Sequence, residues 1–250
     1  MTAVLETVRL CKRFGGVAVA NDINFRLEAG ARHALIGPNG AGKTTFVNLL
    51  SGRLAPSAGR ILLGNADITR LPQAQRVKRG LGRTFQINTL FKGLPVLENV
   101  CLAAAEHAGF GARMLRAAGA QRDTMEHAFG LLDRLGIADV AALPVKELPY
   151  GKQRLVEIAI ALALQPSVLL LDEPAAGVPS AESSVILDVI GQLPESVAVL
   201  IIEHDMELVF RFARRITVLV QGGVLVEGAP AEIAADPRVR EVYLGERQHD

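Results

Sequence analysis

Residues 37–45 combine the residue types and the spacing that chemistry on a polyphosphate requires. They read Gly-Pro-Asn-Gly-Ala-Gly-Lys-Thr-Thr and fit the pattern Gly-x-x-x-x-Gly-Lys-Ser/Thr. Glycines let backbone N–H groups curl toward phosphate oxygens, and a helix that begins directly afterwards adds positive partial charge. We expect Lys43 to contact the β- and γ-phosphates and the Thr44 hydroxyl to ligate Mg²⁺. The candidate nucleotide-binding residues of this loop are Gly37, Pro38, Asn39, Gly40, Ala41, Gly42, Lys43, Thr44 and Thr45.

The flanking sequence predicts the elements that must hold this phosphate loop. Residues 32–36, Arg-His-Ala-Leu-Ile, form a short apolar strand, and residues 45–50 continue as an apolar helix. A strand, then a glycine-rich loop, then a helix is the context in which this motif binds phosphate. The sequence therefore predicts nucleotide binding.

Such a loop needs carboxylates nearby, and we expect them on the strand beside it. Residues 168–174 read Val-Leu-Leu-Leu-Asp-Glu-Pro, an apolar strand that ends in two acids. Asp172 is placed to hold Mg²⁺ through a water molecule, and Glu173 to polarise the attacking water. Taken alone, the pattern also fits a strand whose final carboxylates are merely solvated. The phosphate loop earlier in the chain favours the catalytic interpretation.

Composition narrows the class of protein. The chain has 250 residues and a net charge of +1, which calls for neither nucleic acid nor an anionic membrane as a partner. Cys11 and Cys101 lack metal-ligand spacing and are interpreted as reduced thiols. The N-terminus does not resemble a secretion signal, and no apolar run reaches the ~20 residues that span a bilayer. We expect a cytoplasmic protein.

The predicted elements suggest an α/β core with an insertion. Alternating apolar residues before position 30 predict strands in a mixed sheet, with a further strand at 60–63. Residues 96–143 are rich in Ala and Leu at helical spacing, including Met125 and Phe129, and are broken by Gly109, Gly111 and Gly119. We therefore divide the single domain into a core of 1–95 and 144–250 and a helical insert of 96–143. Helices are expected at 152–163, 181–192 and 206–213. Buried strands of a mainly parallel sheet are expected at 167–171 and 196–202, and terminal strands at 216–220 and 223–227.

Further motifs, in order along nearly the whole chain, resemble the ATPase subunits of ABC transporters. Residues 148–154, Leu-Pro-Tyr-Gly-Lys-Gln-Arg, occupy the place of the ABC signature ahead of a helix. Gln86 matches the glutamine of the Q-loop, His204 the switch histidine, and Phe14 the aromatic residue that stacks on adenine. Each of these residues alone fits an ordinary structural role as well. The resemblance implies a P-loop NTPase (ABC ATPase) fold, with a mixed or parallel sheet core, an antiparallel β subdomain and an inserted helical subdomain.

The resemblance also implies roles for these residues. The implied catalytic residues are Lys43, Gln86, Glu173 and His204, and the implied Mg²⁺ ligands are Thr44, Gln86 and Asp172. In this family two such domains close head-to-tail, so Pro149, Tyr150 and Gly151 of the signature would contact the ATP bound by the other subunit. ATP and Mg²⁺ are the implied cofactors.

Several segments are more similar to one branch of the family, the importers of branched-chain or other hydrophobic amino acids, and within it to the longer of their two ATPase subunits. These segments are residues 84–86, 90–94, 96–100, 202–206, 236–239 and 243–245. The implied partners are membrane permease subunits, a second ATPase subunit in a heterodimer or a homodimer, and, indirectly, a periplasmic substrate-binding protein. The implied location is the cytoplasmic face of the inner (cell) membrane, and the cargo a branched-chain or hydrophobic amino acid or a related small carboxylate.

Two prolines depart from the common ABC pattern. Pro149 stands where the signature usually has Ser, and it offers neither a hydroxyl nor an N–H to a γ-phosphate. Pro179 stands in the D-loop, residues 175–179, where Asp or Asn is usual. Because Gly151 and the following helix N-terminus remain, we expect weakened rather than abolished anion binding. Variation without functional effect is the alternative.

Three other functions are compatible with part of this pattern. A soluble, non-transport ABC ATPase that acts on nucleic acid is disfavoured by the near-neutral charge. A nucleotide-gated interaction protein with low turnover is conceivable because of Pro149, but Glu173 and His204 are intact. A P-loop kinase would leave the signature and the switch histidine unexplained. An ATPase that powers import fits the whole pattern.

Overall fold

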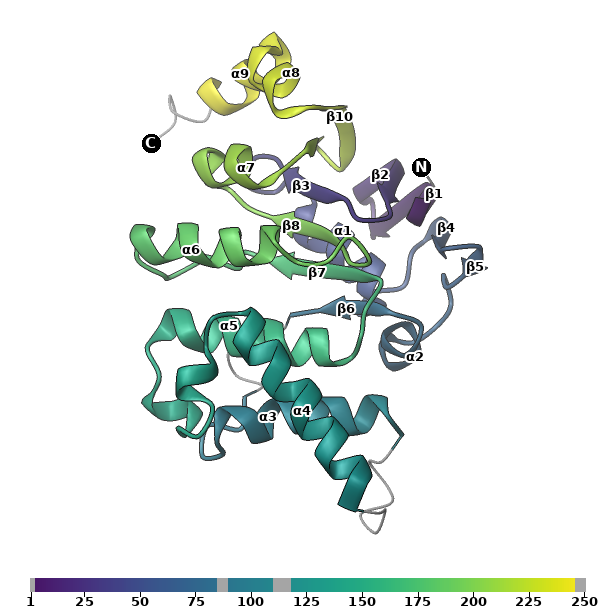
Figure 1. Cartoon of the computed structure of the whole chain (residues 1–250). Helices are drawn as coiled ribbons and strands as arrows, with labels where there is room; N and C mark the ends of the chain where they lie inside the picture. Colours follow the sequence, from purple (N-terminus) through teal and green to yellow (C-terminus); the bar gives the residue numbers. More distant parts are fainter. Residues whose placement is uncertain (1–2, 85–89, 110–117, 246–250) are drawn as a thin grey trace.

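A computed structural model describes residues 3–84, 90–109 and 118–245 of the chain. It contains two sheets, a larger one that runs through the middle of the molecule and a smaller one that lies at the right in Figure 1. The smaller sheet is antiparallel, in the order β2-β1-β4-β5. Its strands are β1 (Ala3–Phe14), β2 (Val17–Glu28), β4 (Ala58–Leu63) and β5 (Ala66–Asp67). This sheet confirms the predicted antiparallel β subdomain.

The larger sheet has six strands in the order β10-β9-β3-β8-β7-β6. Neighbours from β9 to β6 are parallel, and β10 pairs with β9 in an antiparallel hairpin. The strands are β3 (Arg32–Ile36), β6 (Leu81–Arg83), β7 (Val168–Asp172), β8 (Ala198–Ile202), β9 (Arg215–Val220) and β10 (Gly223–Gly228). The predicted mixed, mainly parallel core is confirmed, and each predicted strand begins and ends within two residues of the observed one.

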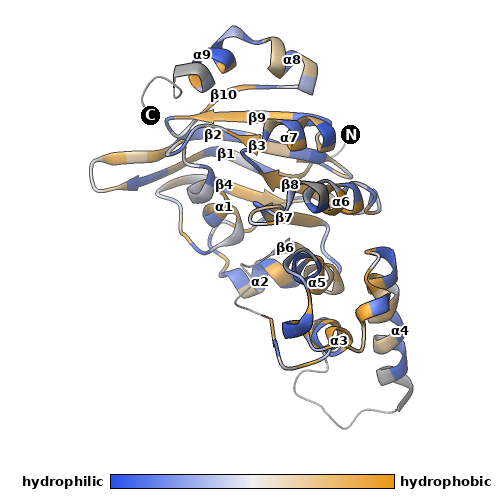
Figure 2. Cartoon of the chain, turned by 90° about the vertical axis from the view of Figure 1, so that its left-hand side faces the viewer, coloured by the Kyte–Doolittle hydropathy of each residue, from blue (hydrophilic) through white to orange (hydrophobic). Residues whose placement is uncertain are grey.

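Alternate residues of these strands face two separate hydrophobic cores. Leu35 of β3 packs into a core between the two sheets, together with Phe46 of helix α1. Ala34 and Ile36 of the same strand face a second core on the opposite side, which is covered by helices α3 to α8. Burial on both faces requires continuous apolar strands, and Figure 2 shows this hydrophobic colouring along β9.

The helices complete the layers around the large sheet. They are α1 (Lys43–Ser51), α2 (Gln73–Lys78), α3 (Val96–His107), α4 (Ala118–Arg134), α5 (Tyr150–Ala163), α6 (Ser180–Gly191), α7 (Met206–Phe212), α8 (Pro230–Ala235) and α9 (Pro237–Gly245), with 3-10 turns at Ala138–Val140 and Val145–Glu147. No helix within the described ranges is long and apolar enough to cross a membrane.

The predicted helical region contains α3 and α4, which pack against each other and on α5 at one end of the molecule (Figure 1). The backbone at its two ends pairs, because Pro95 and Pro144 form a β-bridge. Gly119 was expected to break a helix, and this prediction is wrong, because Gly119 lies in the first turn of the seventeen-residue helix α4. Gly109 does follow the end of α3, with a φ of +75°. Gly111 lies outside the described residues.

Candidate active site

The phosphate loop contains two glycines at positions where a side chain would collide with neighbouring strands. Gly37 has a φ of +153°, and a Cβ atom there would collide with the carbonyl oxygen of Leu219. Gly42 has a φ of +97°, and its Cβ would come within 2.5 Å of the carbonyl oxygen of Val19. These conformations favour glycine, and the missing side chains let the loop pack closely against the backbones of β9 and β2.

The turn between β9 and β10 hydrogen-bonds to the phosphate loop and is itself bound to β2. The N–H of Gly222, in the turn between β9 and β10, donates to the carbonyl of Ala41 at 3.0 Å. The carbonyl of Gly222 in turn accepts from Asn21 of β2 at 2.8 Å. The loop is thus fixed by both sheets before any nucleotide arrives, which reduces the ordering that binding requires.

Lys43 is the first residue of α1, and its ammonium folds back over the loop. Its Nζ donates to the carbonyl of Gly37 at 2.5 Å and to that of Pro38 at 3.0 Å. Thr44 is exposed on the first turn of the helix, and Thr45 is half-buried. The positive charge and the helix N-terminus therefore lie at the same place, as an anion site requires.

The two carboxylates lie where β7 ends, but β7 is not the strand beside the phosphate loop. That expectation was wrong, because β8 lies between β3 and β7. The carboxyl end of β8 carries Glu203 and His204. As parallel strands end at one edge of a sheet, Asp172, Glu173 and His204 come from adjacent strands.

Glu173 and His204 lie close together at this edge. His204 Nδ1 is 3.7 Å from Glu173 Oε1, and the His204 side chain is 69% exposed while that of Glu173 is 47% exposed. Glu173 has a φ of +48°, which is uncommon for a residue with a side chain, and its N–H donates to the carbonyl of Ile202 at 3.0 Å. Strained backbone of this kind clusters at active sites, where the surrounding structure holds it.

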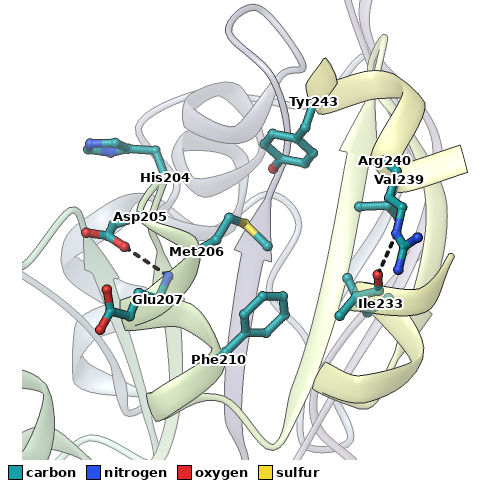
Figure 3. A pocket seen from close by; sticks show the side chains of 10 residues that line it. His204, Asp205, Met206, Glu207, Phe210, Ile233, Val239, Arg240 and Tyr243 are labelled. Carbon is teal, nitrogen blue, oxygen red and sulfur yellow. Dashed lines mark hydrogen bonds between the residues drawn. The ribbon is translucent and has the colours of Figure 1, made fainter. Parts of the chain in front are cut away.

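A cleft of about 650 Å³ lies next to His204, between α7 and the C-terminal helices α8 and α9 (Figure 3). Met206, Phe210 and Tyr243 gather around this cleft, whereas the His204 ring lies at its edge. Asp205 caps α7, because its Oδ1 accepts from the N–H of Glu207 at 2.9 Å. The cap fixes the start of α7 directly after His204.

Glu203 is a residue of this edge that the sequence analysis did not single out. Its side chain is 2% exposed, and its Oε1 accepts from the N–H of Ala175 in the D-loop at 3.3 Å. Burial raises the pKa of the Glu203 carboxyl, which the Ala175 N–H and the neighbouring His204 partly oppose. The Glu203 carboxylate therefore links residues 175–179 to the end of β8, beside His204. The available signal was an acid that directly continues a fully apolar strand.

Replacing Glu203 with Gln should change how stability depends on pH. A carboxyl whose pKa is raised by folding stabilises the protein below its ordinary value of 4.5, and this contribution is lost as the pH rises. The amide keeps an acceptor for Ala175 but does not ionise. We expect the melting temperature of Glu203→Gln, relative to the unmodified protein, to increase between pH 5 and pH 8. A difference that does not vary with pH would contradict a buried, titrating Glu203.

The signature segment and the D-loop pack together. Pro149 caps the N-terminus of α5 without a side-chain hydrogen bond, and Pro179 does the same for α6. Tyr150 contacts the D-loop, since a Cβ added at Gly177 would lie 3.4 Å from its ring. A Cβ at Gly151 would collide with the carboxylate of Glu182 on α6. The two segments therefore form one surface of this chain.

For two of the residues implied by the resemblance, Phe14 and Gln86, the structure gives few contacts that bear on their implied roles. Phe14 ends β1 and is 50% exposed, and Lys12 Nζ lies 5.1 Å from the centre of its ring. Gln86 lies outside the described residues, three positions along the sequence from Arg83, the last residue of the edge strand β6. Their roles toward adenine, phosphate and metal remain proposals.

The donor set fits Mg²⁺ held together with a triphosphate. Thr44 supplies a hydroxyl and Asp172 a carboxylate, which are the hard oxygen ligands that Mg²⁺ takes. The described residues contain no group of three acidic, His or Cys side chains that would form a cage without a nucleotide. Mg²⁺ commonly binds through one or two protein ligands, water and substrate phosphates, so these residues suit it.

Comparison with known proteins identifies the family. A family model described as ABC transporter matches residues 20–176. The chain belongs to the ABC transporter family. A second model, described as branched-chain amino acid ATP-binding cassette transporter, matches residues 224–249. Membership explains the order of the phosphate loop, the signature and the Asp-Glu pair along the sequence.

Relatives of this ABC chain are similar over their full length. It is 38% identical to the high-affinity branched-chain amino acid transport ATP-binding protein BraF of Pseudomonas aeruginosa, covering 97% of this chain and 98% of BraF. Identity and coverage are the same for LivG of Escherichia coli. Among solved structures, the ADP conformation of MJ1267, an ATP-binding cassette of an ABC transporter, matches with a TM-score of 0.85 and 29% identity, covering 98% of this chain and all of MJ1267. The predicted ABC ATPase fold is confirmed.

Proposed function

We propose that this chain is the ATP-hydrolysing subunit of an importer that takes up branched-chain or other hydrophobic amino acids, or a related small carboxylate, through separate membrane subunits. The observation that carries this proposal is the similarity to BraF and LivG, which extends from the phosphate loop to the C-terminal helices. These relatives are transport proteins, so they favour the importer over a non-transport ATPase.

The geometry of the site supports a different role in ATP hydrolysis for each of its residues. The backbone N–H groups of the loop hold the phosphates, and Lys43 neutralises charge on the β- and γ-phosphates. Glu173 accepts a proton from the attacking water, and His204, 3.7 Å from Glu173, contacts the γ-phosphate when the site closes. Mg²⁺, when bound through Thr44 and Asp172, supplies further positive charge to the phosphate oxygens. Gln86 would join these residues from the segment after β6.

We propose that the site is completed by a second ATPase subunit. A related cassette, MJ0796, is dimeric in its solved structure, with a TM-score of 0.75 over 90% of this chain and 25% identity. In such a pair, the surface formed by the signature and the D-loop would face the partner's nucleotide. Closing on ATP and reopening after hydrolysis would then drive the membrane subunits.

Pro149→Ser should strengthen this closure. The serine hydroxyl adds a hydrogen bond to a charged phosphate, worth roughly 1.5–3 kcal/mol, or about ten- to a hundredfold in affinity. We expect the isolated chain to be mostly monomeric, with low turnover, and the variant to form more ATP-dependent dimer and to hydrolyse ATP faster. Sedimentation with ATP and Mg²⁺ measures the first effect, and phosphate release the second. If neither increases, the proline is variation without effect.

The same proposal includes the location of the protein in the cell and the division of its chain into a core and a helical insert. We place it at the cytoplasmic face of the inner (cell) membrane, as a peripheral subunit that reaches a periplasmic binding protein only through the permease. The β-bridge between Pro95 and Pro144 supports residues 96–143 as the inserted helical part, with 1–95 and 144–250 as the core. In this proposal, the segment after Gln86 and the helical insert would form the groove that receives the membrane subunits.

Uptake by cells of the source organism tests the proposal. Two strains are compared, one with the unmodified gene and one in which that gene carries Lys43→Ala. Initial uptake of labelled Leu, Ile, Val and small carboxylates is measured at low concentrations of these compounds. We expect the Lys43→Ala strain to lose uptake of at least one of these compounds, with sugar uptake as the control. Equal uptake of every compound by both strains would overturn the assigned cargo.

A further inference from the structure

Arg83 is a buried arginine that ends β6, three residues before Gln86. Its side chain is 7% exposed, and its Nη2 donates to Asp172 Oδ2 at 3.0 Å. The partner is the carboxylate to which the proposed function gives the metal role. A buried charge requires partners, and the structure assigns this guanidinium a specific set of them.

The other end of the guanidinium reaches the helix that follows the phosphate loop. Arg83 Nη1 donates to Asn48 Oδ1 at 2.8 Å and to Ser51 Oγ at 3.0 Å. Both residues lie on α1, four and seven positions after Thr44. Residues at these spacings share one face of a helix, so Arg83 contacts the face of α1 that begins with Thr44.

The geometry of this contact suits a positioning role. The planar fork of an arginine can bind two elements at once in a fixed orientation, which a lysine cannot do. Here it binds a single oxygen of Asp172, leaving Oδ1 for other ligands, and ties β7 to α1. The two elements that carry the oxygen donors are therefore held in register by one side chain.

We propose that Arg83 is a positioning residue for the Mg²⁺ site, orienting the Asp172 carboxylate and fixing its distance from the Thr44 helix. This inference rests on the proposed function, since it assigns Asp172 and Thr44 to the metal. Residues that hydrogen-bond metal-ligating carboxylates set their orientation, and their loss typically costs about 10- to 100-fold in metal affinity or activity. Burial lowers the pKa of the Arg83 guanidinium, and the neighbouring Asp172 carboxylate opposes this lowering.

A second buried arginine provides the matched control. Arg76 on α2 is 1% exposed, and it also binds α1, through the carbonyls of Leu49 and Leu50 at 2.7 Å each. Its remaining bonds go to the carbonyls of Thr69 and Leu71. Arg76 therefore anchors the same helix as Arg83, but its hydrogen bonds all go to backbone carbonyls and none to a carboxylate. Its replacement tests the effect of a lost structural arginine alone.

The test measures the Mg²⁺ dependence of nucleotide binding, which does not require turnover. A fluorescent ATP analogue is titrated onto full-length Arg83→Met, Arg83→Lys and Arg76→Met, with increasing Mg²⁺ or with EDTA. We expect Arg83→Met to raise by about 10- to 100-fold the Mg²⁺ concentration at which Mg²⁺-dependent binding of the analogue is half-maximal. The affinity for the analogue in EDTA should not change. Arg83→Lys should recover part of the shift, and Arg76→Met should show none. Combining Arg83→Met with Asp172→Asn should add no further shift to that of Asp172→Asn.

Unchanged Mg²⁺ dependence in a folded Arg83→Met, or an equal shift in Arg76→Met, would overturn the positioning role. If Arg83→Met does not fold, the double variant Asn48→Ala, Ser51→Ala removes the α1 anchors and keeps the pair with Asp172. It should shift the Mg²⁺ dependence in the same direction, and no shift there would also overturn the proposal. Failure of the metal role given to Thr44 and Asp172 is distinct, because the unmodified chain would then show no Mg²⁺-dependent ATP binding. Failure of the proposed importer function is distinct again, because it is measured by the loss of uptake in cells and not by this titration.

Discussion

Replacing Glu173 with Gln is expected to slow ATP hydrolysis by about 10²- to 10⁴-fold, the range that a positioned general base contributes. The amide keeps the shape of the side chain but accepts no proton from the attacking water. ATP binding should therefore persist, and the variant should accumulate as an ATP-bound dimer.

Phosphate release and sedimentation with ATP and Mg²⁺ measure the two halves of this prediction. Glu241→Gln, an exposed carboxylate on α9, is the matched control and should keep both properties of the unmodified protein. Normal hydrolysis by Glu173→Gln would remove Glu173 from the role of general base.

Replacing Lys43 with Ala is expected to weaken ATP binding by about ten- to a hundredfold, because a hydrogen bond to a charged group contributes roughly 1.5–3 kcal/mol. The structure places the ammonium over the loop, bonded to the carbonyls of Gly37 and Pro38. No other lysine of the loop can replace it, since residues 37–45 contain one. Turnover should fall with binding.

Equilibrium titration with a fluorescent ATP analogue checks the Lys43 prediction, with the exposed Lys78→Ala on α2 as the control for loss of a surface charge. An unchanged affinity and turnover in Lys43→Ala would contradict the assignment of residues 37–45 as the phosphate site.

Local patterns were sufficient to predict most of the fold. The strand at Arg32–Ile36, the glycine-rich loop and the helix after it are adjacent in sequence, so their types and order could be inferred directly. The parallel strands β7, β8 and β9 are buried on both faces, and continuous apolar runs of this kind are visible without a structure.

Contacts between distant segments could not be predicted in this way. Strand order depends on pairing across the sheet, which is why the position of β8 between β3 and β7 was missed. Arg83 and Asp172 are 89 residues apart, and an arginine at a strand end is normally solvated rather than bound to a carboxylate. From the sequence, Glu203 is an ordinary polar residue after a strand. Only the fold shows that Ala175 of the D-loop donates a hydrogen bond to its carboxylate.

In the proposed function, hydrolysis at this chain's own site drives a solute across the membrane. The most direct test is transport in proteoliposomes that contain the membrane complex purified through this chain, with ATP hydrolysis and leucine movement followed in the same vesicles. We predict that the unmodified complex moves leucine only when Mg²⁺ and ATP are on the side of this chain, and that Glu173→Gln stops both processes. Leucine transport that continues at the unmodified rate in Glu173→Gln vesicles would contradict the claim.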